Sequence, residues 1–148
     1  MRKVASITAI LVGIVMAIAG VVTFVVVSTT LSDQKITVSE DASCAAGDGV
    51  NGPLSAYCQA KVIDKHTKAI TGGKTYAELA RDDPNRAVAA DSAFLQASLF
   101  TSVVAFGVAA LVMGVGVLFG LIGYAIRTLA PVTVTTVRGT DENVLNAV

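Results

Sequence analysis

The chain has 148 residues, of which 53% are hydrophobic and only 15% are charged, with eleven basic and eleven acidic side chains. This composition is too apolar for an ordinary soluble domain. No cluster of basic residues accompanies it, which argues against a nucleic-acid partner. We therefore expect a protein whose main solvent is the lipid bilayer.

The first element expected is a transmembrane helix over residues 1–32. Residues 4–32 contain no charged side chain and no histidine, and this run exceeds the roughly 20 residues that an α-helix needs to cross a bilayer. A cleaved signal peptide is the alternative, because Arg2 and Lys3 precede the run and residues 17–19 resemble a cleavage site. Signal peptides have apolar regions of only about 7 to 15 residues, so we expect a retained anchor.

Residues 33–91 form the long polar segment and carry most of the charged side chains. They include Cys44 and Cys58, the two cysteines of the chain. In an exported segment, two thiols at this distance tend to form a disulfide. Closing a loop of about 15 residues stabilises a small fold by on the order of 3 kcal/mol in the chain-entropy model. A redox-active pair needs the closer C-x-x-C spacing, so the disulfide is predicted to be structural.

The rest of the polar segment is expected to be mostly helical. Pro53 suits a first helical position, and a weakly apolar face follows it at spacings of four and three until Gly72. The members of this face are Ala56, Ala60, Ile63, Thr67 and Ile70. Thr75 and Glu78 have the spacing of a capping box and predict a further short helix.

The second transmembrane helix is expected over residues 92–127, with an extension at its start that stands outside the membrane. No charged side chain or histidine interrupts this stretch before its last residue, and nothing after Asn85 forces a break. Asp83 and Pro84 have the pattern of a cap and a first helical position. Residues 128–148 show no periodic apolar face and are expected to form a cytoplasmic tail.

Basic residues near the span ends predict the orientation. Arg2 and Lys3 precede the first span. Arg127 and Arg138 follow the second, in a segment free of acidic residues until Asp141. Under the positive-inside rule both termini are cytoplasmic and the polar segment is extracytoplasmic. The expected location is therefore the plasma (inner) membrane of a bacterial cell.

Small residues recur along one side of each span and are candidates for helix packing. They are Ala9, Gly13, Ala17 and Gly20 in the first span and Ala109, Gly116, Gly120 and Gly123 in the second. Such stripes let helix backbones approach closely in lipid. The two spans are expected to pack on each other as a hairpin, and docking on other membrane proteins is the alternative use of either stripe.

Several features of chemically active proteins are missing from the sequence. The apolar runs 4–32 and 92–126 contain no charged residue or histidine of the kind that transporters use at membrane depth. The chain has one histidine, His66, in a polar stretch, so we expect no metal site. No glycine-rich phosphate loop follows a strand and no nucleophile elbow is present. We therefore expect neither a cofactor nor an enzymatic activity.

Several stretches of the chain resemble a known family. They are MRKVASITAILVGIVMAIAG, KITVSEDA, NGPLSAYCQAKVIDKHT, TGGKTYAELARDDPNRA and SLFTSVVAFGVAALVMGVGVLF. Over residues 1–129 they are similar to small two-span membrane proteins of actinobacteria, which commonly carry the label "aromatic ring-opening dioxygenase, LigA". Iron enzymes of that kind hold their metal with two histidines and a carboxylate, and this chain has one histidine. The resemblance therefore implies the two-span architecture without the labelled chemistry.

The expected fold class is an all-α membrane protein, in which two transmembrane helices form a hairpin. Residues 33–91 form a small, mostly helical exported cap with one disulfide. Two functions remain open. The first is a non-catalytic accessory or scaffold subunit, whose partners are the bilayer and other membrane protein subunits; a respiratory complex is an analogy for such an assembly. The second is an extracytoplasmic sensor or ligand-binding module, and the sequence does not identify its small-molecule ligand.

Overall fold

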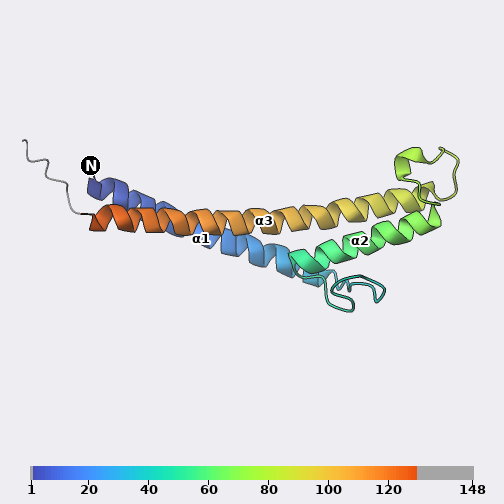
Figure 1. Cartoon of the computed structure of the whole chain (residues 1–148), viewed down its shortest axis with the longest axis horizontal. Helices are drawn as coiled ribbons and strands as arrows, with labels where there is room; N and C mark the ends of the chain where they lie inside the picture. The colour runs from blue at the N-terminus through green and yellow to red at the C-terminus, as the bar shows by residue number, and fades with distance from the viewer. Residues whose placement is uncertain (1, 130–148) are drawn as a thin grey trace, which may run out of the picture.

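The computed structural model describes residues 2–129, and within this range the chain is helical and contains no strand. The elements are α1 (Arg2–Asp33), α2 (Pro53–Ile70), the 3₁₀-helix η1 (Tyr76–Glu78) and α3 (Arg86–Thr128). Figure 1 shows α3 as one long rod, with α1 and α2 lying one after the other along it. The predicted helical fold is confirmed for these residues, and nearly all of the predicted tail lies outside them.

The two longest helices, α1 and α3, are long and apolar enough to cross a membrane. They contain 32 and 43 residues, which correspond to about 48 and 65 Å at ~1.5 Å per residue. Both lengths exceed the roughly 30 Å of a bilayer's hydrocarbon core. Part of α3 therefore extends beyond any membrane that it crosses, and α2 packs on that part.

The ends of α2 follow from its local sequence. Pro53 occupies the start of the helix, where its missing N–H costs no hydrogen bond. After Ile70 the backbone turns through Gly72 and Gly73, whose φ angles of 64° and 86° lie in the left-handed region that favours glycine. The predicted start and stop of this helix are therefore confirmed.

The apolar face predicted for α2 is correct over its first part and wrong at its end. Ala56 and Ala60 are buried, whereas Ile63 and Thr67 are half-buried. Ile70 is 53% exposed, because the chain leaves the helix there and no other element covers it. The face ends in a polar contact with α3, where the Thr67 hydroxyl donates a hydrogen bond of 2.5 Å to the hydroxyl of Ser92.

The segment between α2 and α3 is held by polar contacts at the tip of the cap. The Glu78 carboxylate accepts hydrogen bonds of 2.8 Å from both the N–H and the hydroxyl of Thr75, as the capping-box pattern predicted. The backbone N–H contributes most to this stabilisation of the charged form, which lowers the pKa of Glu78. The Arg86 guanidinium lies 4.2 Å from the centre of the Tyr76 ring and attaches η1 to the start of α3.

The start of α3 corrects the sequence prediction by two residues. Asp83 and Pro84 were expected to be the N-cap and the first helical residue. Instead, the N-cap is Asn85 and the first helical residue is Arg86. The Asp83 carboxylate accepts a hydrogen bond of 2.8 Å from the Asn85 N–H, so these residues form a turn that leads into the helix. From Arg86 the helix runs without a break to Thr128.

A compact apolar cluster lies where the end of α1, residues 34–52, α2 and α3 meet. Its buried members are Leu31, Val38, Val50, Ala56, Cys58, Ala60, Leu99 and Phe106. Residues 34–52 reach this cluster through a backbone bridge, in which the Val38 N–H donates to the Asp48 carbonyl at 2.9 Å and the Val50 N–H to the Ile36 carbonyl at 2.8 Å. Both valines are buried, so residues 34–52 contribute to a core that the cap shares with α1 and α3.

Candidate functional site

The interface between α1 and α3 is built on glycines whose backbones touch. A Cβ atom added to Gly13 would lie 2.5 Å from the Gly116 carbonyl oxygen and 2.7 Å from the Gly120 nitrogen. A Cβ atom added to Gly116 would lie 2.7 Å from both the Ala17 nitrogen and the Gly13 carbonyl oxygen. No side chain fits at this level, so glycine is needed on both helices for the approach seen here.

The same close approach occurs at two further levels. A Cβ atom on Gly20 would lie 2.8 Å from the Ala109 carbonyl oxygen, and one on Gly123 would lie 2.9 Å from the Ser6 carbonyl oxygen. The Ser6 hydroxyl also donates a buried hydrogen bond of 2.7 Å to the Gly123 carbonyl. These pairs run in opposite directions along the two helices, so α1 and α3 are antiparallel.

Sequence reasoning missed Ser6 because it followed small residues at spacings of three and four. The buried positions of α1 at this interface are Ser6, Gly13 and Gly20, which are seven residues apart. A seven-residue repeat keeps its residues on one face of two helices that wind around each other. This repeat was visible in the sequence and would have identified Ser6.

The remaining candidate packing residues lie at the edges of the interface. Ala9 and Ala17 are half-buried. Gly120 approaches Gly13 through its backbone, but a Cβ atom added to Gly120 would meet nothing within 4 Å. Gly116 and Gly120, which are four residues apart on α3, therefore differ, since only Gly116 excludes a side chain.

The predicted disulfide is present in the cap. Cys44 and Cys58 are bonded, with their Cα atoms 5.7 Å apart and a sequence separation of 14. Cys58 lies on the buried side of α2, so the bond fastens residues 34–52 to that helix. The pair joins two elements of the cap core, which fits the structural role predicted for it.

A second link between the same two elements is electrostatic. The Asp41 carboxylate lies 2.9 Å from the Lys65 Nζ and 2.8 Å from the His66 Nε2. The hydrogen bond from Lys65 and then that from His66 favour the charged carboxylate and lower the pKa of Asp41 to about 2. His66, which lies in the polar stretch noted in the sequence, is exposed, and its contact with Asp41 was not foreseen because 25 residues separate them.

The candidate functional site is an apolar groove at the base of the cap, formed by the end of α1, by α2 and by α3. It encloses about 780 Å³, and none of the described residues that line it is charged. Most of its lining is apolar and includes Val26, Leu31, Ile63, Phe94, Leu95 and Ala105. Its uncharged polar lining residues are Thr30, Gln34, Gln59, Ser98, Thr101 and Ser102. Phe94 is 75% exposed and Leu95 is 47% exposed, although neither lies at an end of the molecule.

The groove was not among the sites predicted from the sequence, and the described residues offer no competing metal site. Residues 2–129 contain no group of three or more histidine, cysteine, aspartate or glutamate side chains close enough to hold a metal ion. Comparisons with protein-family models, with curated proteins and with solved structures found no match to the chain. The candidate site therefore rests on the geometry of the groove.

Proposed function

We propose that the chain is a non-catalytic integral membrane protein that serves as an accessory or scaffold subunit of a larger membrane complex. Membrane insertion is supported by the outer surfaces of α1 and α3, where large apolar side chains such as Val15 and Leu111 are about two-thirds exposed. An apolar surface of this extent is unfavourable in water and matches the hydrocarbon of a bilayer.

The proposed topology has both termini in the cytoplasm and the cap outside. The antiparallel contacts from Ser6–Gly123 to Gly20–Ala109 support termini on one side of the membrane. The disulfide supports an oxidising, extracytoplasmic location for the cap. The topology is tested by introducing cysteine in place of Lys61 on α2 or of Thr140 in the tail. We expect an impermeant thiol reagent to label the cysteine at position 61 in intact cells. It should label the cysteine at position 140 only after the cells are permeabilised.

The observation that carries the docking proposal is the exposed apolar groove. On α3 its lining extends from Phe94 to Ala105, which is about 16 Å along the helix axis or three turns. An elongated groove without charge suits an apolar helix of a partner membrane protein, laid along the groove through regularly spaced side chains. The end of the groove at Ala105 adjoins the part of α3 that we propose to face lipid. A membrane helix therefore reaches the groove without leaving an apolar environment.

The docking proposal is tested by comparing Phe94→Glu with Val88→Glu. Both residues are exposed apolar side chains of α3, but only Phe94 lines the groove. After purification in mild detergent, we expect one subunit to accompany the wild type and Val88→Glu in constant ratio and to be lost from Phe94→Glu. A photo-crosslinker at position 94 should attach to that same subunit.

Two results would contradict the docking proposal. One is retention of the subunit by Phe94→Glu, and the other is a crosslink from position 94 to lipid alone or to a second copy of the chain. A third result would favour the sensor function, because the groove's volume falls within the roughly 300 to 1,000 Å³ of ligand pockets. In that case native mass spectrometry would find a small apolar molecule that is bound by the wild type and absent from Phe94→Glu.

A further inference from the structure

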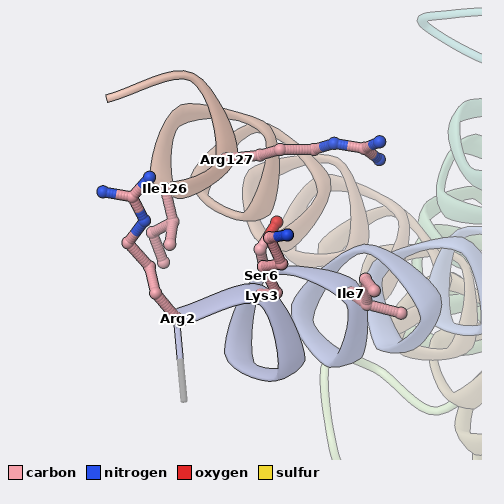
Figure 2. Close-up of a pocket in the computed structure, with 6 residues that line it drawn as sticks. All are labelled: Arg2, Lys3, Ser6, Ile7, Ile126 and Arg127. Atoms are coloured by element: carbon pink, nitrogen blue, oxygen red, sulfur yellow. The ribbon is translucent and has the colours of Figure 1, made fainter. Parts of the chain in front are cut away.

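A second pocket lies at the opposite end of the molecule from the cap, between the first turns of α1 and the last turn of α3. It encloses about 330 Å³. Its lining residues are Arg2, Lys3, Ser6, Ile7, Ile126 and Arg127. Figure 2 shows that its cationic side chains come from both helices, with Arg2 rising beside the end of α3 and Arg127 extending over α1.

Within the described segments that form this pocket, no acidic side chain balances its charge. Residues 2–32 and 92–129 contain no aspartate or glutamate. Among the described residues, none of Arg2, Lys3 and Arg127 takes part in an ion pair. Three cationic residues thus line one small pocket, and their mutual repulsion favours binding of an anion.

The tight end of the hairpin brings these charges together. The Ser6 hydroxyl donates a hydrogen bond of 2.7 Å to the Gly123 carbonyl. Gly123 has no side chain that would keep α1 from approaching. These contacts hold the last turn of α3, with Arg127, against the first turns of α1. The walls formed by Ile7 and Ile126 are apolar, so the pocket combines cationic groups with a hydrocarbon surface.

We propose that this pocket binds the phosphate group of an anionic phospholipid. One arginine guanidinium group can bind two phosphate oxygens through two parallel hydrogen bonds. Basic pockets between membrane helices on the cytoplasmic side bind anionic lipid headgroups. Free phosphate carries the same negative charge but has no acyl chain. Only a phospholipid can therefore also contact Ile7, whose side chain is half-exposed next to the pocket. The proposal rests on the membrane insertion and orientation proposed above, and it is independent of any partner subunit.

The experiment measures lipid binding to the purified full-length protein in detergent, by native mass spectrometry and by the shift in thermal unfolding temperature. The probes are phosphatidylglycerol, phosphatidylcholine with the same acyl chains, and inorganic phosphate. We expect only phosphatidylglycerol to bind and to raise the unfolding temperature, since a ligand that binds the folded state stabilises it.

The matched variants are Arg127→Gln, Arg127→Lys and Lys61→Gln. Arg127→Gln should weaken phosphatidylglycerol binding about fivefold, as expected for one basic group at a membrane surface. Arg127→Lys keeps the charge and should retain most of the affinity, and Lys61→Gln, on the cap, should bind like the wild type. Arg2 and Lys3 stay in place in these variants, so the basic residues that precede the first span are unchanged.

Three results would overturn the inference. They are equal binding of phosphatidylglycerol and phosphatidylcholine, stabilisation by inorganic phosphate as strong as that by phosphatidylglycerol, and unchanged binding by Arg127→Gln. The outcome is separable from that of the docking proposal, because lipid binding is measured on the isolated chain. A protein that binds phosphatidylglycerol as expected but co-purifies with no subunit supports this inference and contradicts the scaffold function.

Discussion

The two halves of α3 are packed by different means, although they belong to one continuous helix. The C-terminal half lies against α1 through glycine backbones and the Ser6–Gly123 hydrogen bond. The N-terminal half lies against α2 in a cap that has a disulfide, ion pairs and a cluster of buried apolar side chains. A single helix thus takes part in two kinds of interface.

The difference matches the solvent that we propose for each half. Lipid tails are as apolar as leucine, so helices gain little in a bilayer by burying apolar side chains, and close backbone contact stabilises them instead. In water the burial of apolar surface is favourable, but a cap of this size has a small core and benefits from a covalent link. Near the junction of the two halves, Phe106 of α3 packs on Phe24 of α1, with their ring centres 4.8 Å apart.

The largest effect is expected where the two halves meet. Phe106 is 2% exposed and belongs to the central apolar cluster, so Phe106→Ala should lower the free energy of unfolding by about 3 to 5 kcal/mol. Phe119→Ala is the control, because Phe119 lies on the outer surface of the same helix. Denaturation in mixed micelles measures both. Equal losses would mean that Phe106 does not join the two halves.

Removal of the disulfide should affect the cap and leave the hairpin intact. Replacing Cys44 and Cys58 by serine should cost about 3 kcal/mol of cap stability in the chain-entropy model. Hydrogen exchange should accelerate in residues 34–52 and remain unchanged in residues 6–20. In wild-type protein isolated from membranes, both thiols should resist alkylation. Free thiols there, or equal acceleration in both regions, would contradict the separation of the two halves.

The hairpin is tested by two glycines that are four residues apart on α3. Gly116→Ala should destabilise the protein by about 1 to 3 kcal/mol, because its Cβ atom meets the backbone of α1. Gly120→Ala has open space at the new methyl group and should stabilise the helix by about 0.5 to 1 kcal/mol. Thermal unfolding in detergent measures both. The same sign for the two variants would show that the close approach at Gly116 is not needed.

The smallest effect is expected from the exposed ion pairs of Asp41, which are screened by solvent. Its pKa falls from 3.8 to about 2 on folding, so its contribution is fully present above about pH 4 and is lost as the pH falls through 2. Asp41→Asn should speed hydrogen exchange in residues 39–47 slightly at pH 6. The same change at Asp48, which makes no ion pair among residues 2–129, should not. An equal response of the two variants would mean that the ion pairs of Asp41 do not stabilise the contact between residues 34–52 and α2.

Local rules of sequence were sufficient to predict the helices, apart from the exact start of α3, and the covalent link. Uninterrupted apolar runs determine the long parts of α1 and α3, because a helix is the form in which a single segment satisfies its backbone in lipid. Pro53 and Gly72 determine the ends of α2 through their fixed or permissive φ angles. The spacing of the two cysteines, combined with the expected exported location, was enough to predict the disulfide.

Tertiary structure decided which faces meet. Small residues at spacings of three and four suggested a broad stripe, but the packing of α1 on α3 buries Ser6, Gly13 and Gly20, which are seven residues apart. The groove beside Phe94 and the contact between Asp41 and His66 each join elements that are distant in the chain. Their formation depends on how α2 lies along α3, and that geometry is set by the sum of many weak contacts, which no short stretch of sequence specifies.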